Sequence, residues 1–389
     1  MSPAVNISAL TFLESFAAVL VQRAIYFYTK DRLGFSDAAN LWLALIAGVT
    51  YVAGAMSSHA VSRRVGERRL LLSVLTVQLL LTVVLAAWPR PAVLFAGVGL
   101  LGVVLGLKWP VVESYASAGL PPATAAGAVG RFNFCWASSI PVSLAVAGPL
   151  IAWRSWALFA VAGGVNVVCF GLLARLRPRP AHLPADHPER PDPARVARLT
   201  CLQTAARWIM LASYAGMWIL GALMPGVLGR LGFRARTATA LWGLTDAARL
   251  ATFVLLGLWT GWHERRGGLV RAMILLPAGF ALMLFAPNLP VVLAGELLFG
   301  WAAGEAYYAA LYYAMVAQNA SVAAGGGHES LIGLGFVLGP LAGLGGVALK
   351  PLLSDERLGV LAAAGVLILA CSLQASRALL RTEARSDRG

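Results

Sequence analysis

The segment RPRPAHLPADHPERPDP, residues 177–193, separates two halves of the chain that are otherwise dominated by long apolar stretches. Proline lacks a backbone donor and fixes φ, so a stretch this rich in proline and charge is predicted to be neither helical nor buried. We expect an exposed linker at residues 176–198 between two folding units, residues 1–175 and 199–389. A solvated linker is favoured over a nucleic-acid-binding or lipid-binding role for its arginines.

Apolar stretches long enough to cross a bilayer fill both halves. A helix needs roughly 20 mostly apolar residues to cross about 30 Å of hydrocarbon. These stretches are too long and too uniformly apolar for the strands of a membrane barrel, so they are predicted to be helices. The expected transmembrane helices cover residues 8–28, 38–61, 69–88, 92–116, 125–151, 154–175, 200–224, 237–262, 269–286, 289–316, 326–349 and 357–380.

Composition also indicates a membrane protein. Hydrophobic residues make up 59% of the sequence and charged residues only 12%, which is unlike an ordinary soluble domain. The formal net charge of +14 could suit nucleic acid, but the basic residues lie in short loops and form no basic face. We therefore expect a lipid bilayer around the protein and no nucleic-acid partner.

The loops indicate the orientation of the chain. Lys and Arg are more frequent in the loops near residues 63–69, 175–198 and 264–271 and in the C-terminal tail than in the alternate loops. Because basic loops stay in the cytoplasm, both termini are predicted to be cytoplasmic. The preference for Arg over Lys and the many Ala residues are typical of a GC-rich bacterial genome, which favours a multi-pass protein of the bacterial inner membrane and a monomer.

The two halves contain matching motifs in the same order. Three pairs recur at similar separations, namely Gly66 with Gly267, Gly106-Leu-Lys-Trp109 with Gly304-Glu-Ala-Tyr307, and Gly148-Pro149-Leu150 with Gly339-Pro340-Leu341. Such internal similarity predicts a duplicated six-helix unit. The expected fold is therefore an all-α integral membrane protein, with 12 transmembrane helices in two pseudo-symmetric six-helix bundles.

The loops that carry the first of these matches resemble a family signature. The motif Arg64-x-Gly66-x-Arg68-Arg69 resembles the signature of the major facilitator superfamily between its second and third helices, and Glu264-Arg265-x-Gly267 resembles its echo in the second half. Arg63 stands where that family usually has Asp. The resemblance implies a gate motif at Arg64, Gly66, Arg68, Glu264, Arg265 and Gly267, and a central cavity lined by the first, fourth and tenth helices.

Ionisable side chains inside the spans are candidate functional groups, since each costs roughly 2.5–3.5 kcal/mol at the centre of a membrane helix. Glu14, Asp246 and Glu305 are the proton-coupling candidates, and the counter-charge candidates are Lys108, Arg249 and Arg23. Static charge pairing is the alternative for all of them. Asp246 and Arg249 in particular are three residues apart on one helical face and can neutralise each other.

Other charged residues lie toward the expected cytoplasmic ends of their spans, namely Arg131, Glu113, Arg207, His328 and Glu329. At such depths, long side chains reach the interface or pair at a gate. We therefore expect these residues to contact substrate less often than the central charges do.

Aromatic and amide side chains gather in the same spans. Flat aromatic walls with a few polar groups suit an amphipathic organic solute. The expected cavity residues are Trp109, Asn133, Trp136, Gln203, Trp242, Tyr307 and Tyr308. Trp109 and Tyr307 occupy corresponding positions of the repeat, so both are expected to face one cavity.

Together these features predict a secondary active transporter that moves a small organic solute by alternating access, by symport with H⁺. An uncoupled facilitator of the same fold and a non-transporting membrane sensor or scaffold are the alternatives. No phosphate loop, HExxH, GxSxG or metal-spaced Cys or His cluster occurs, so we expect no enzyme activity, no cofactor and no metal.

Overall fold

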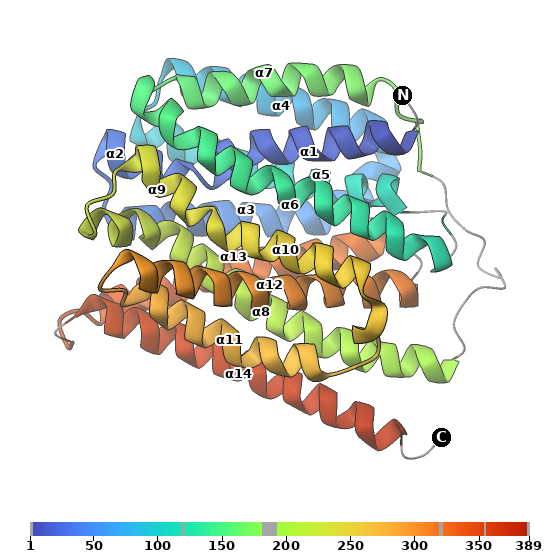
Figure 1. Ribbon diagram of the computed structural model, residues 1–389. Helices are drawn as coiled ribbons and strands as arrows, with labels where there is room; N and C mark the ends of the chain where they lie inside the picture. The colour runs from blue at the N-terminus through green and yellow to red at the C-terminus, as the bar shows by residue number, and fades with distance from the viewer. Residues whose placement is uncertain are drawn as a thin grey trace.

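The computed structural model describes residues 3–117, 120, 122–180, 193–318, 322–353 and 355–386, and these residues form helices without strands (Figure 1). The helices are α1 (Pro3–Gln22), α2 (Ile25–Leu33), α3 (Asp37–Val65), α4 (Glu67–Ala87), α5 (Pro91–Ser117), α6 (Pro122–Trp153), α7 (Ala157–Leu173), α8 (Pro193–Arg230), α9 (Ala235–Trp242), α10 (Leu244–Leu258), the short 3-10 helix η1 (Thr260–Trp262), α11 (Gly267–Leu284), α12 (Leu289–Gln318), α13 (Val322–Ala348) and α14 (Glu356–Ser386).

These helices confirm the predicted fold class. Among the described residues, 11 helical segments are long and apolar enough to cross a membrane, and α7, with 17 residues, is a shorter apolar helix. Lipid offers no hydrogen bonds to a backbone, so each segment satisfies its own amides by forming a helix. The middle residues of the expected linker, 181–192, lie outside the described residues. Helix α8 begins at Pro193, so residues 193–198 of the expected linker are helical.

Two spans predicted as continuous helices are broken. The first span divides into α1 and α2 at Arg23 and Ala24, where the amide of Ala24 donates to the carbonyl oxygen of Val19 at 3.1 Å. The eighth divides into α9 and α10 at Gly243. Neither Arg23 nor Ala24 is a helix breaker, so the sequence carries no signal for the first break.

The segments run side by side between two ends of the molecule. The start of α1, the end of α7, the start of α8 and the end of α14 lie at one end, which we call the linker end, while α2 and α9 lie at the opposite end (Figure 1). The two halves meet where α3 packs against α13 and where α6 packs against α9 and α10. The first contact joins the second span to the eleventh, and the other joins the fifth span to the eighth. This pairing is expected for two halves related by a pseudo-twofold axis.

Close backbone approach at glycines holds the halves together. A Cβ atom on Gly148 of α6 would overlap the carbonyl oxygens of Ala235 and Arg236 in α9. One on Gly48 of α3 would overlap the carbonyl of Phe336 in α13. Small residues allow membrane helices to pack at this distance, so the two contacts seal the interface between the halves.

Candidate functional site

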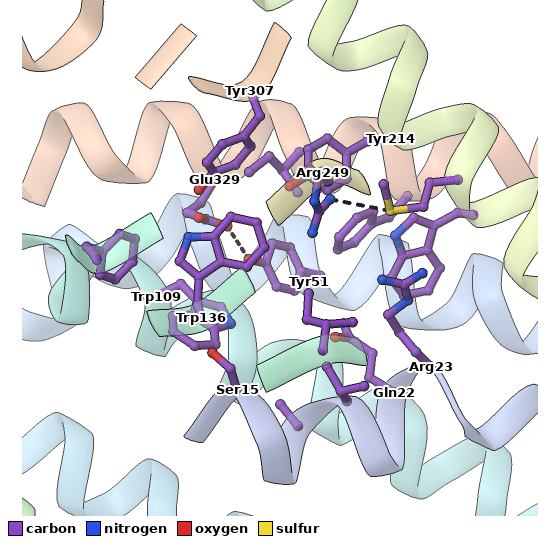
Figure 2. Close-up of a pocket in the computed structure, with 18 residues that line it drawn as sticks. Ser15, Gln22, Arg23, Tyr51, Trp109, Trp136, Tyr214, Arg249, Tyr307 and Glu329 are labelled. Atoms are coloured by element: carbon purple, nitrogen blue, oxygen red, sulfur yellow. Dashed lines mark hydrogen bonds between the residues drawn. The ribbon is translucent and has the colours of Figure 1, made fainter. Parts of the chain in front are cut away.

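A cavity of about 110 Å³ lies between the two halves (Figure 2). Both halves supply its walls: the broken first span, α3, α5 and α6 from one side, and α8, α10, α12 and α13 from the other. The lining residues are Ser15, Ala18, Val19, Gln22, Arg23, Tyr51, Trp109, Phe132, Trp136, Ile140, Tyr214, Met217, Trp218, Arg249, Tyr307, Glu329, Ile332 and Phe336.

Eight of the 18 residues that line the cavity are aromatic. The rings of Trp136 and Tyr307 meet edge to face, with centroids 5.1 Å apart, and Tyr214 lies 6.1 Å from Tyr307. Trp109 and Tyr307, the two positions matched by the repeat, both line this cavity. Such walls suit a flat or apolar solute body.

A cluster of three charges crosses between the halves toward the opposite end. Arg23 donates through Nη1 to Oδ2 of Asp246 at 2.6 Å, and Nη2 of Arg249 lies 3.2 Å from Oδ1 of the same carboxylate. The side chains of Asp246 and Arg249 are 1% and 3% exposed, so the pairs are shielded from water. Arg23 lies in the break of the first span and Asp246 follows the break of the eighth, so the two broken helices meet at one ion pair. Unwound helices line substrate and ion sites in many transporters.

Two carboxyl groups from different halves meet on the linker side of the cavity. The hydroxyl of Tyr51 in α3 donates to Oε2 of Glu329 in α13 (Figure 2). The carboxyl group of Glu113 in α5 lies beside that of Glu329 and interacts with it. The cavity therefore lies between a cross-half ion pair on one side and a cross-half carboxyl pair on the other.

Glu14, a proton-coupling candidate, and Lys108, a counter-charge candidate, both lie outside the cavity lining. Nζ of Lys108 donates to Oε2 of Glu14 at 2.7 Å, and both side chains are only 2% exposed. The ammonium group also lies 4.5 Å from the ring centroid of Trp109. This arrangement joins α1 to α5 within the first half.

Glu305, the other predicted acid of the central helices, also lies away from the cavity. Arg271 of α11 donates to its carboxylate, so the pair joins two neighbouring helices of the second half. Asp246 alone among the three proton-coupling candidates contacts a cavity-lining residue of the opposite half, Arg23.

The expected cavity residues divide into two groups. Trp109, Trp136 and Tyr307 line the cavity. The others occupy neighbouring positions, where Asn133 accepts a hydrogen bond from Trp136 at 3.0 Å and the buried Trp242 stacks under the guanidinium of Arg23 at 5.6 Å. Gln203 is buried in α8 and Tyr308 lines a second pocket.

This second pocket, of about 490 Å³, lies at the linker end between α6 and α10. The ring of His263 stacks on Tyr312 with centroids 4.4 Å apart, and the Tyr312 hydroxyl lies 3.3 Å from Nδ1 of His263. Burial lowers the pKa of His263, so its imidazole is neutral at pH 7. Cys135 also lines the pocket.

The loop between α3 and α4 carries the first part of the expected gate motif. Gly66 joins these helices with a φ of 88°, a conformation that glycine adopts readily. Arg68 donates to the carbonyl oxygen of Leu176 at 3.2 Å, while Arg64 is exposed. These contacts tie the loop to the end of its own half.

The corresponding loop of the second half is also held by its own half. Glu264 receives hydrogen bonds from Arg195 at 3.0 Å and from Arg198, both in α8. The backbone amide of Arg265 donates to a carbonyl of η1, and Gly267 begins α11. Both gate-motif loops therefore make their described hydrogen bonds within their own half of the protein.

Sequence reasoning placed less weight on the carboxyl pair than its position merits. Glu113 and Glu329 lie near the ends of their spans, where snorkelling explains most charges, and Tyr51 carried no signal at all. Within the described residues, no group of three His, Cys, Asp or Glu side chains could hold a metal ion.

Comparison with known proteins gives the family and the fold. The model of the Major Facilitator Superfamily matches residues 7–346, whereas no curated protein matches the chain by sequence. A bacterial homologue of the human lysosomal transporter Spinster, inward-facing and unoccupied, is similar with a TM-score of 0.70 and 16% identity over 98% of both chains. The nucleoside transporter NupG has a TM-score of 0.67 at 12% identity, covering 96% of this chain and 99% of its own.

The human organic anion transporter MFSD10 (TETRAN) has a TM-score of 0.65 and 15% identity, covering 96% of this chain and 98% of its own. At these identities the likeness to solved structures shows the fold alone. The family match, in contrast, covers most of the sequence. The chain therefore belongs to the major facilitator superfamily and is a multi-pass membrane transporter.

Proposed function

We propose that this protein is a secondary active transporter that carries a small organic solute together with a proton, by alternating access. The cavity lies between the halves, as the binding site of a rocking transporter must. It is lined by aromatic rings and by a few charged groups, which suits an organic solute better than a bare ion. The proposal places the protein in a bacterial inner membrane as a monomer, with both termini and the linker end in the cytoplasm.

The observation that carries proton coupling is the meeting of Glu113 and Glu329 across the halves. Two adjacent carboxylates repel each other strongly in a site shielded from water, so the pair favours holding one proton between them. The Tyr51 hydroxyl donates a hydrogen bond to Oε2 of Glu329 and so holds this carboxyl group in position. Loss of the proton would leave two negative charges in contact and favour separation of α5 from α13 at the linker end.

The three acids favoured by sequence alone fit the proton role less well. Glu14 pairs with Lys108, Asp246 with two arginines, and Glu305 with Arg271. Each of these acids therefore already has a basic partner, whereas Glu329 faces a second acid. We infer that these acids hold the helices in place and that Glu329 carries the proton.

Proteoliposomes provide the test of the proposed function. The purified protein is reconstituted, a pH gradient is imposed, and uptake is measured for a solute found by thermal-shift screening, since a bound ligand raises apparent stability. Accumulation against the solute gradient that collapses on adding an uncoupler is expected. Equilibration without accumulation would instead identify an uncoupled facilitator, and the absence of any solute movement would favour a sensor or scaffold.

Replacement of Gly148 by alanine is expected to shift the transporter toward the state that is open at the opposite end. The new Cβ atom overlaps carbonyl oxygens of α9, so α6 and α9 must separate. Overpacking of this kind costs about 1–3 kcal/mol, which corresponds to roughly a 5–150-fold shift between two states. Closure of the linker end should then reduce maleimide labelling of Cys135 in a Cys201→Ser background.

Gly164→Ala provides the matched control, because Gly164 in α7 has open space where the Cβ would be added. Its labelling rate should equal that of the parent protein. Unchanged labelling of Cys135 in the Gly148→Ala variant, with the protein folded, would contradict the role of this contact in alternating access.

A further inference from the structure

Arg249 has hydrogen-bonding capacity that the protein leaves unused. Its guanidinium offers five N–H donors, and the side chain is only 3% exposed. Nη2 lies near Asp246, Nη1 reaches only the sulfur of Met217 at 3.6 Å, and buried Nε has no partner within the described structure (Figure 2). Leaving buried donors unpaired is costly, so this arrangement favours a ligand that accepts hydrogen bonds.

The charge balance at this side of the cavity also favours an anion. Arg23 and Arg249 share a single carboxylate, that of Asp246. Glu296 of α12 is the next acid nearby and interacts electrostatically with Arg23, but it is fully buried, lies outside the cavity lining and makes no described ion pair with either arginine. Two guanidinium groups therefore share one carboxylate on this side of the cavity, so a bound anion would complete their pairing.

The surroundings of Arg249 indicate what the rest of the ligand is like. The guanidinium lies over the ring of Trp136 at 4.7 Å and 5.9 Å from that of Tyr214. A carboxylate can accept two parallel hydrogen bonds from such a guanidinium, while the aromatic walls contact an apolar body attached to it. A cationic ligand would be repelled by both arginines.

We propose that the cavity binds an organic monoanion, a carboxylate on a compact aromatic or other apolar body, with Arg249 as its principal anion-binding group. This inference rests on the proposed function only in treating the cavity as the transport site. It also gives the proton a role in selection. Protonation of Glu329 removes a negative charge from the cavity wall, so proton and anion each favour binding of the other.

Isothermal titration of the purified full-length protein tests the ligand class directly. The probes are benzoate, phenylacetate and 3-phenylpropanoate, each compared with the amide and the amine of the same carbon skeleton. We expect at least one carboxylate to bind at least tenfold more tightly than its amide, and the amines to bind more weakly still. Equal or tighter binding of the amides or amines, or no binding by all three carboxylates, would overturn the proposal.

Substitutions at Arg249 identify the binding group. Arg249→Gln is expected to weaken carboxylate binding at least tenfold and to leave amide binding unchanged, whereas Arg249→Lys keeps the charge and should fall between. Arg357→Gln is the control, since Arg357 pairs with Asp355 in the turn before α14, away from the cavity. Unchanged carboxylate affinity in Arg249→Gln would remove Arg249 from the site.

The pH dependence of binding to the unmodified protein covers the case in which an Arg249 variant does not fold. Glu329 faces Tyr51 of α3, Glu113 of α5, Tyr214 of α8 and Tyr307 of α12, with Arg249 of α10 nearby. Carboxylate affinity should fall at high pH, as Glu329 loses its proton, and this fall should be absent in Glu329→Gln. The same pH dependence in both proteins would contradict the link between proton and anion.

Failure of this inference is distinguishable from failure of the proposed function. Carboxylate binding without proton-driven accumulation would leave the ligand class standing and remove the coupling. Proton-driven accumulation of a neutral solute, without carboxylate binding, would retain the transporter and overturn the anion site.

Discussion

The variant Glu329→Gln is expected to lose proton-driven accumulation completely while retaining exchange of solute across the membrane. Glutamine keeps a hydrogen bond to Tyr51 but carries no charge and binds no proton, so it resembles the protonated carboxyl group. A gradient of one pH unit is worth about 1.4 kcal/mol per proton, which sustains about tenfold accumulation with one proton per solute. The variant should therefore reach an inside-to-outside ratio of about one.

Two further glutamine variants make this measurement selective. Glu356→Gln removes an acid that pairs with Lys350 near the surface and should accumulate solute like the parent protein. Glu305→Gln separates the two hypotheses for the proton site, because the sequence favoured Glu305 and the geometry favours Glu329. Loss of accumulation in Glu305→Gln but not in Glu329→Gln would place the proton site at Glu305 and contradict the role of Glu329.

Removal of Lys108 is expected to give the largest loss of stability. In Lys108→Met the buried carboxylate of Glu14 loses its 2.7 Å partner. Breaking a buried ion pair by deleting one partner costs about 3–5 kcal/mol, since it leaves a charge without compensation. Such a loss is a large fraction of the stability of most proteins, so the variant should show a much lower yield of folded protein and a lower melting temperature in detergent.

The double variant Glu14→Gln with Lys108→Met should recover most of this loss, because no buried charge then remains. Lys350→Met breaks the surface pair with Glu356, in which the Lys350 side chain is 68% exposed. This substitution should change the free energy of unfolding by less than about 1 kcal/mol. Equal destabilisation by Lys108→Met and Lys350→Met would show that the buried pair contributes no more than a surface pair.

Individual residues show how far sequence reasoning reaches. The spacing of Asp246 and Arg249 predicted that they share a helical face, and the structure places them 3.2 Å apart. The repeat matched Trp109 with Tyr307, and both line one cavity. These inferences rest on helical periodicity and on duplication, which are both local properties of the chain.

Contacts between distant spans were beyond this reasoning. Tyr51 and Glu329 are 278 residues apart, and Arg23 and Asp246 are 223 residues apart. Whether such groups meet depends on the rotation and depth of each helix, which are set by packing against its neighbours. The helix breaks beside Arg23 and Asp246 change the rotation of the residues that follow them. The first break contains no proline or glycine from which it could be predicted.

The sequence by itself determined that the chain crosses a membrane as helices and that its halves repeat, because hydrocarbon leaves a long apolar segment no other way to satisfy its backbone. Only the tertiary structure decided which charges pair within one half and which meet across the cavity. Glu14 and Lys108 look as functional in the sequence as Glu329 does. Their difference arises from packing, which gives one acid a basic partner and sets the other beside a second acid.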